Sequence, residues 1–336
     1  MHPGQHWLTV PVVAGLVAAQ FPQWAGLPVV PVDSAGTVNA LFRIGPDLVC
    51  RFPLQGSDPG RTLTDLIAER QAARLLSDAV SAQVPEFVAM GSPGIGYPLP
   101  WSVYRWLPGR TAVNVKPTIE LAADLARTVR EIRSIDIGAR RFAGSGRGGR
   151  LADHDDWVHQ CLAVSGDLID VPALQRLWHG LRVREPGPVR MTHGDLMPGN
   201  LLIDAGRLTA VLDVATAQPA DPAVDLAPAW NLLDGAARDR FREQLQVDEP
   251  EWERGRGWAL VQAIGALEYY HRSNPVMSRL AHRTLRALLA TTASMMTHSS
   301  SAPLDHDDGG RSYGDRCRAR PAQARGVVPR AGSHGR

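Results

Sequence analysis

A short stretch in the second half of the chain gathers three side chains that could carry out phosphoryl transfer. The segment 193–204 reads HGDLMPGNLLID, and Asn200 follows Asp195 by five positions. A turn at 205–206 and a second apolar run then lead to Asp213, thirteen positions after Asn200. We expect a loop closed by a tight hairpin to bring the three side chains together.

These side chains divide into one base and two oxygen ligands. The carboxylate of Asp195 can face an acceptor hydroxyl, while the amide oxygen of Asn200 and the carboxylate of Asp213 can face Mg²⁺. This cation takes one or two ligands from protein and the rest from phosphates and water. Phosphoryl transfer needs positioning and charge neutralisation more than covalent help. An isolated His-Gly-Asp would indicate only a turn, but the ordered set favours a kinase.

His193 is a second candidate for the proton transfer, because histidine titrates near neutral pH. The alternative is that its ring packs and hydrogen-bonds inside the catalytic loop. We name His193 and Asp195 together as catalytic-loop residues, and we expect the base to be Asp195.

The elements around this segment predict an α+β fold with two lobes. Short strands are expected in the first third, over 29–32, 40–44, 48–52 and 102–106. Residues 12–21 and 62–79 have helical patterns, and the later part of the chain is mainly helical, over 119–132, 155–168, 172–181 and 258–296. A strand-rich insert at 191–214 interrupts these helices.

The same pattern predicts where the lobes begin and end. We assign 1–105 to a β-rich nucleotide-binding lobe and 106–297 to a larger helical lobe that binds the acceptor. Residues 298–336 are rich in Gly, Ser, Arg and Asp without periodicity, which is typical of a disordered tail. A ligand is expected in the cleft between the lobes.

Glu69 lies on the apolar stripe of the helix expected over 62–79. An unpaired carboxylate would be costly there, so it needs a partner. Arg51 on the preceding strand is the candidate, because Lys116, the only lysine, lies outside the first lobe. The alternative is an ordinary surface arginine and a glutamate whose head group reaches solvent.

Several of these segments together resemble the aminoglycoside phosphotransferase family, a branch of the protein-kinase-like fold. The similarity covers about residues 10–295 and is carried by His-Gly-Asp with the following Asn, by Val-Leu-Asp, and by DPAVDLA, at 193–200, 211–213 and 221–227. It also includes 36–45 and 269–275. The segment 214–218 departs from the family's pattern, which has an aromatic residue followed by glycine or an acidic residue.

The resemblance implies roles for particular residues. Asp195 becomes the catalytic aspartate, Asn200 and Asp213 the ligands of Mg²⁺, and Asp225 a brace of the catalytic loop. The phosphate donor would be ATP, with GTP as the alternative, and the Arg51–Glu69 pair would match the kinase ion pair that holds the α- and β-phosphates.

Two further nucleotide contacts are weaker. The turn at 34–37 could cover the triphosphate with Gly36 and Thr37, although it lacks a G-x-G-x-x-G pattern. The backbone around Val103 and Arg105 occupies the position of the interlobe hinge and could bind an adenine edge. The alternative is that the aromatic residues of this segment belong to an ordinary core.

The composition limits the partners. There are 36 basic and 34 acidic residues, a formal net charge of +2, so we expect neither nucleic acid nor a membrane as a partner. The three cysteines are widely spaced without a C-x-x-C pair, which predicts a reducing, cytoplasmic compartment. No segment of the sequence is long enough to span a membrane.

The acceptor is left open between two classes of small hydroxylated molecule. An antibiotic kinase would act on a cationic aminoglycoside or on a macrolide, and a polycation predicts an acidic acceptor pocket, for which Asp221, Asp234 and Glu268 are available. A metabolic kinase would act on an amino alcohol, an amino acid or a sugar. A nucleotide-binding regulator without turnover is the third reading, and the oligomeric state is not predicted.

Overall fold

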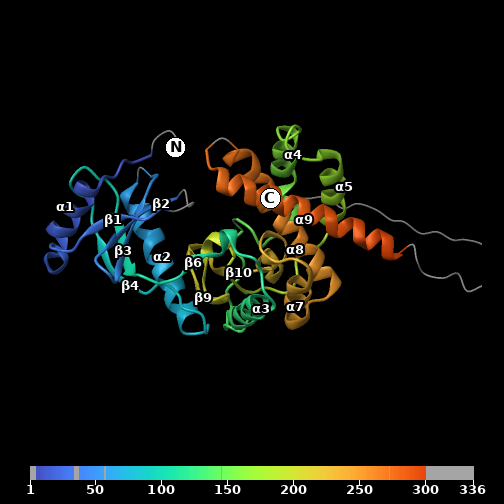
Figure 1. Cartoon of the computed structure of the whole chain (residues 1–336), viewed down its shortest axis with the longest axis horizontal. Helices are drawn as coiled ribbons and strands as arrows, with labels where there is room; N and C mark the ends of the chain where they lie inside the picture. The colour runs from blue at the N-terminus through green and yellow to red at the C-terminus, as the bar shows by residue number, and fades with distance from the viewer. Residues whose placement is uncertain (1–4, 34–37, 57, 145, 272, 300–336) are drawn as a thin grey trace, which may run out of the picture.

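The computed structural model describes residues 5–33, 38–56, 58–144, 146–271 and 273–299 (Figure 1). Most of the predicted tail, 298–336, therefore lies outside the described residues. The structure has a β-rich lobe at one end and a mainly helical lobe at the other (Figure 1). The predicted α+β architecture with two lobes is confirmed.

The first lobe is built on one antiparallel sheet in the order β1-β2-β3-β5-β4. Its strands are β1 (Val29–Pro31), β2 (Asn39–Ile44), β3 (Leu48–Pro53), β4 (Phe87–Gly91) and β5 (Trp101–Arg105). The helices are α1 (Val10–Gln20), the 3₁₀ turn η1 (Pro22–Trp24) and α2 (Pro59–Ser77).

Burial of large aromatic and aliphatic side chains holds this sheet together. Phe52 and Trp101 stack with ring centroids 4.7 Å apart, and both are buried. Trp101 lies directly over Gly91, where an added Cβ would come within 2.0 Å of the indole. The close approach of the two strands at this point therefore requires glycine.

Short strands of the second lobe surround the site, and all but the first of them follow helices of the same lobe in the chain. The strands are β6 (Arg110–Thr111), β7 (Arg190–Thr192), β8 (Leu201–Asp204), β9 (Arg207–Val211) and β10 (Gln218–Ala220). They form a three-stranded sheet, β6-β8-β9, and a two-stranded sheet, β10-β7. Short 3₁₀ segments join them, namely η2 (Ala112–Asn114), η4 (Pro198–Asn200), η5 (Val214–Thr216) and η6 (Pro222–Leu226).

Helices make up the rest of this lobe. They are α3 (Ile119–Arg133), α4 (Asp155–Ala163) after η3 (Leu151–His154), α5 (Val171–Leu181), α6 (Pro228–Asn231), α7 (Gly235–Leu245), α8 (Glu249–Tyr270) and α9 (Pro275–Ser299). Among the described residues, no helix combines the length and apolar character needed to cross a membrane.

The helical stretch expected over 258–296 is two helices packed against each other rather than one. The break has a local cause, because Pro275 cannot donate a backbone hydrogen bond and favours the first turn of a helix. Asn274 supplies the cap, its side chain accepting from the N–H of Met277 at 3.2 Å.

The end of α2 joins the two lobes. Leu76 belongs to the buried cluster of the second lobe, and the backbone of Gln83 exchanges hydrogen bonds of 2.9 Å with Thr209 and Val211 of β9. The helix that carries Glu69 is therefore anchored to the strand that leads to Asp213. The assignment of 1–105 and 106–297 to separate domains stays a prediction.

Candidate active site

The β8–β9 hairpin brings Asn200 and Asp213 to neighbouring positions. Leu201 pairs with Val211 across the hairpin, and one step further the N–H of Leu212 donates to the backbone oxygen of Asn200 at 2.8 Å. The turn places Ala205 and Gly206 at positive φ, 46° and 79°, as a tight hairpin requires. The spacing of thirteen residues between Asn200 and Asp213 therefore places both residues at the end of the hairpin opposite the turn.

Asn200 also contacts the third member of the set. Its Nδ2 donates to the backbone oxygen of Asp195 at 2.9 Å and to Oδ2 of the same residue at 3.0 Å. Because the amide nitrogen is used on Asp195, the amide oxygen is the atom left to act as a ligand. The structure thus brings together the three residues on which the phosphoryl-transfer interpretation rests.

Asp225 braces the loop that carries Asp195 through two backbone hydrogen bonds. It is fully buried, and its two carboxylate oxygens accept the backbone N–H groups of His193 and Gly194, each at 2.8 Å. Gly194 has φ +80°, a conformation that glycine adopts without strain. Burial raises the pKa of Asp225, although the two backbone donors act in the opposite direction.

His193 is held by backbone groups on both sides of its ring. Nε2 lies 3.0 Å from the oxygen of Leu212, and the N–H of Asp195 donates to Nδ1 at 3.3 Å. The side chain is fully buried. This geometry supports the packing role for His193 and leaves Asp195 as the group that faces outward.

Arg51 of β3, which is partly buried, and Glu69 of α2, which is buried, form an ion pair. Their side chains are 14% and 8% exposed. Burial raises the pKa of Glu69, and the Arg51 guanidinium beside it pulls that pKa back down. Arg51 also reaches the second lobe, with Nη2 3.3 Å from Oδ1 of Asp213. One guanidinium therefore connects α2 to the hairpin.

The remaining nucleotide contacts are placed as follows. Gly36 and Thr37 lie outside the described residues. Val103 is buried in β5, paired with Cys50 on one side and Ala89 on the other. The N–H of Arg105 donates to the oxygen of Glu86 at 2.9 Å. The role of this strand in nucleotide binding stays a prediction.

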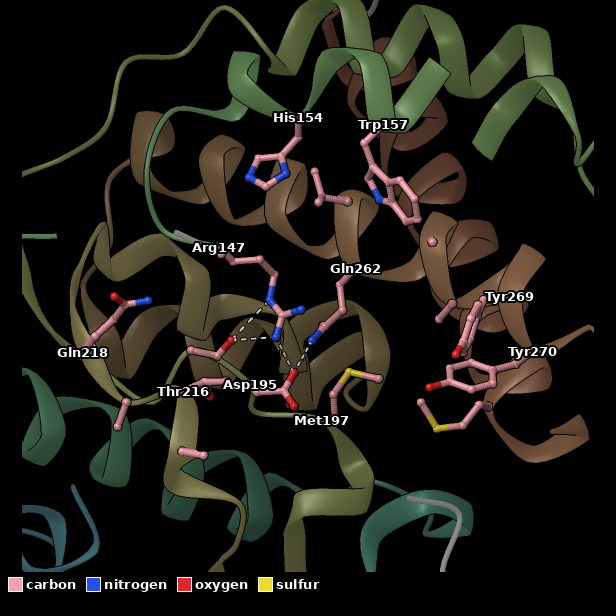
Figure 2. A pocket seen from close by; sticks show the side chains of 18 residues that line it. Arg147, His154, Trp157, Asp195, Met197, Thr216, Gln218, Gln262, Tyr269 and Tyr270 are labelled. Atoms are coloured by element: carbon pink, nitrogen blue, oxygen red, sulfur yellow. Dashed lines mark hydrogen bonds and ion pairs between the residues drawn. The ribbon is translucent and has the colours of Figure 1, made fainter. Parts of the chain in front are cut away.

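A cavity of about 770 Å³ opens above Asp195 in the second lobe (Figure 2). Oδ1 of Asp195 accepts from Nη2 of Arg147 and from Nε2 of Gln262, both at 2.6 Å. Arg147 is fixed further by Nε and Nη2, which donate to the oxygen of Gly194 at 3.3 and 3.0 Å. The carboxylate is thus held at the floor of the cavity by donors from three parts of the chain, namely Arg147, Asn200 and Gln262.

Arg147 and Gln262 were missed by the sequence analysis. Gln262 stands in the otherwise apolar run WALVQAIGAL of α8, and a polar side chain on such a face was a usable signal. Arg147 lies in the glycine-rich segment GSGRGGR, which has no periodicity to show where it points.

Of the acidic residues considered for a cationic acceptor, Asp221 and Asp234 do not line the cavity. Asp221 is buried, and its Oδ2 accepts from Nε of Arg254 at 2.9 Å. Asp234 is the N-cap residue of α7. The side chain of Glu268 lies outside the part that the structure describes.

Comparison with known proteins gives consistent matches. A family model described as the phosphotransferase enzyme family matches residues 30–258. An aminoglycoside 3'-phosphotransferase of Escherichia coli is 28% identical over 165 residues, covering 45% of this chain and 60% of that protein. The corresponding protein of Streptomyces fradiae is 30% identical over 172 residues, covering 45% and 56%. The chain thus spans little more than half the length of these relatives.

Solved structures match over most of both chains. The GDP complex of aminoglycoside 2'-phosphotransferase-IIIa has a TM-score of 0.63 at 19% identity, covering 86% of this chain and all of that one. A complex of the same type of enzyme with GDP and kanamycin has a TM-score of 0.61 at 20% identity, covering 84% and 98%. Macrolide 2'-phosphotransferase MphH from Brachybacterium faecium has a TM-score of 0.54 at 21% identity, covering 82% and 97%.

Proposed function

The chain belongs to the phosphotransferase enzyme family, and from this premise we propose that it transfers the γ-phosphate of Mg-bound ATP to a hydroxyl of a small molecule. The resemblance drawn from the sequence, and the kinase-like fold that it implied, are confirmed by the matches. Solved neighbours were crystallised with GDP or ADP, so GTP stands beside ATP as a donor.

One observation carries the proposal. Asp195 faces a cavity on one side, while on the other side it contacts Asn200, which is paired through the hairpin with the segment leading to Asp213. A carboxylate offers about four acceptor sites, so the three donors on Asp195 leave room for an acceptor hydroxyl. Asp195 can then accept the hydroxyl proton as the phosphate is transferred.

The oxygen atoms of Asn200 and Asp213 can act as ligands of a magnesium ion. Asn200 offers an amide oxygen and Asp213 a carboxylate that is 41% exposed, both hard ligands of the kind that Mg²⁺ prefers. When bound, the ion neutralises charge on the transferred phosphoryl group. Arg51 lies beside Asp213 and can hold the neighbouring phosphates, and Glu69 fixes its orientation.

The arrangement of Arg147 and Gln262 supports a defined geometry for the base. Both donors meet the same oxygen of Asp195, which fixes the rotation of the carboxylate while Asn200 binds the other oxygen. A preoriented base supports catalysis because no reorganisation is needed as the reaction proceeds.

The metal-binding part of the proposal is tested by calorimetric titration of ATP with and without Mg²⁺. Asp213→Asn should weaken the Mg-dependent binding of ATP at least tenfold, because it removes one charged ligand. Asp204→Asn is the matched control, since Asp204 is exposed at the turn end of the same hairpin. Binding of Mg-ATP by Asp213→Asn with unchanged affinity would contradict the assignment.

A further inference from the structure

Two large aromatic side chains stand half exposed at the rim of the cavity above Asp195. Trp157 of α4 is 47% exposed and Tyr269 of α8 is 48% exposed (Figure 2). Trp157 is seated against Gly265 of α8, where an added Cβ would lie 2.8 Å from Cζ2 of the indole. Because glycine has no side chain, the indole of Trp157 can lie close to α8 at Gly265. Trp157, packed against α8, and Tyr269 together give the cavity an aromatic wall.

Few carboxylates line the part of the cavity that the structure describes. Asp195 is the one carboxylate among the lining residues that the structure describes, and it is already paired with Arg147. The nearby His154 also lines the cavity, and burial lowers its pKa, so its ring is neutral near pH 7. Among the described lining residues, a polycation would find one carboxylate, shared with a guanidinium, for all of its ammonium groups.

Two of the polar side chains at the floor of the cavity bring N–H donors to Asp195. Arg147 presents a guanidinium and Gln262 an amide N–H₂ group, both directed at the carboxylate of Asp195 (Figure 2). N–H donors pair with the oxygens of hydroxyl, ether or carbonyl groups and not with ammonium groups. The N–H groups of Arg147 and Gln262 favour an acceptor rich in oxygen atoms. The rings of Trp157 and Tyr269 favour one with an apolar face.

On the basis of the proposed phosphotransferase function, we propose that the acceptor is an oxygen-rich hydroxylated compound with at most one positive charge. It lays a broad apolar or aromatic face on Trp157 and Tyr269 and directs one hydroxyl to Asp195. A polycationic aminoglycoside is the alternative that this arrangement disfavours. The cavity, at about 770 Å³, has the size of sites that bind drug-sized ligands.

Acceptor binding separates the two classes. Kanamycin serves as the polycation, erythromycin as the macrocycle with a single amine, and salicin as an uncharged aromatic glycoside. Each is titrated into the wild-type protein with Mg²⁺ and an ATP analogue that cannot transfer its γ-phosphate, which prevents turnover and keeps the Asp195 carboxylate in place. We expect erythromycin or salicin to bind at least tenfold more tightly than kanamycin. Equal or tighter binding of kanamycin would overturn the proposal, as would failure of both other compounds to bind.

The aromatic wall is tested by Trp157→Ala, titrated under the same conditions with the compound that binds. Its affinity should fall at least tenfold, while Trp157→Phe should retain most of it. Trp7→Ala is the matched control, because Trp7 is 75% exposed and does not line the cavity. Unchanged affinity in Trp157→Ala would overturn the role of the wall.

The acceptor proposal can fail without the proposed function. Transfer of phosphate to kanamycin by the wild-type protein would remove this acceptor class and leave the kinase intact. Loss of Mg-ATP binding would instead remove the proposed function itself, and the titration of ATP described above detects it independently of any acceptor.

Discussion

The ion pair of Arg51 and Glu69 predicts how the free energy of unfolding changes when one or both side chains are replaced. Removing one partner should destabilise the fold more than removing both. Arg51→Met leaves Glu69 without its cation at a site where the carboxylate is 8% exposed. Breaking one partner out of such a pair typically costs roughly 3–5 kcal/mol of unfolding free energy. Replacing both by apolar residues is often close to neutral.

We therefore expect Arg51→Met to lower the free energy of unfolding by about 3–5 kcal/mol. Glu69→Leu should cost less, because Arg51 keeps Asp213 as a partner, and the double variant should recover most of the loss seen in Arg51→Met. Urea denaturation followed by circular dichroism measures all three. Arg240→Met is the control, because its partner Glu243 is 3.8 Å away and the two side chains are 46% and 69% exposed. An exposed pair of this kind is worth less than about 1 kcal/mol.

The same variants separate stability from function. The recovered double variant should still bind Mg-ATP at least tenfold more weakly than the wild type, because the guanidinium beside Asp213 is gone. Strictly additive losses of stability would refute the pairing argument. A stable double variant with wild-type affinity for Mg-ATP would refute the assignment of Arg51 to the phosphates.

Three further predictions concern the catalytic loop, pH and thiol chemistry. Gly194→Ala should lower the transfer rate at least tenfold and the free energy of unfolding by about 1–3 kcal/mol, since the new Cβ would lie 2.9 Å from the oxygen of Thr216 at a residue with positive φ. Kinetic assays and urea denaturation measure the two effects, and wild-type values for both would contradict the prediction. The hydrogen bond from Arg207 lowers the pKa of Asp124, so the ionised carboxylate stabilises the fold at pH values above its unfolded pKa of about 3.9. The free energy of unfolding lost in Asp124→Asn should therefore be constant near neutral pH and shrink as the pH falls below about 4. Urea denaturation at a series of pH values measures this loss, and a loss that does not change with pH would contradict the prediction. Burial raises the pKa of Cys50, so iodoacetamide should modify this thiol only after the protein unfolds. Mass spectrometry measures the modification, and rapid labelling of Cys50 in the native protein would contradict the prediction.

The hairpin part of the site could be predicted because its geometry is local. Asn200 and Asp213 flank two short strands joined by a tight turn, and pairing of those strands brings the two residues close together in space. Glu69 could be predicted for a similar reason, since helical periodicity alone places it on a buried face. Its need for a cation then follows from the free energy of burying a charge.

The acceptor side could not be predicted from periodicity or spacing. Arg147 reaches Asp195 because an irregular segment between α3 and η3 folds back onto the catalytic loop, a contact between residues 48 positions apart. Asp221 shows the opposite error, because a carboxylate near a catalytic motif was considered available for a cationic ligand. In the structure it is buried against Arg254, and charge alone did not indicate that pairing.

The most direct test of the account is the rate of phosphate transfer from labelled ATP by Asp195→Asn, measured with Mg²⁺ and an acceptor that the wild-type protein uses. The substitution keeps the size of the side chain and removes the base, so the rate should fall by roughly 10²- to 10⁴-fold while Mg-ATP binding remains. Asp204→Asn, on the same hairpin, should transfer phosphate at the wild-type rate. Undiminished transfer by Asp195→Asn would contradict the assignment of Asp195 as the catalytic base.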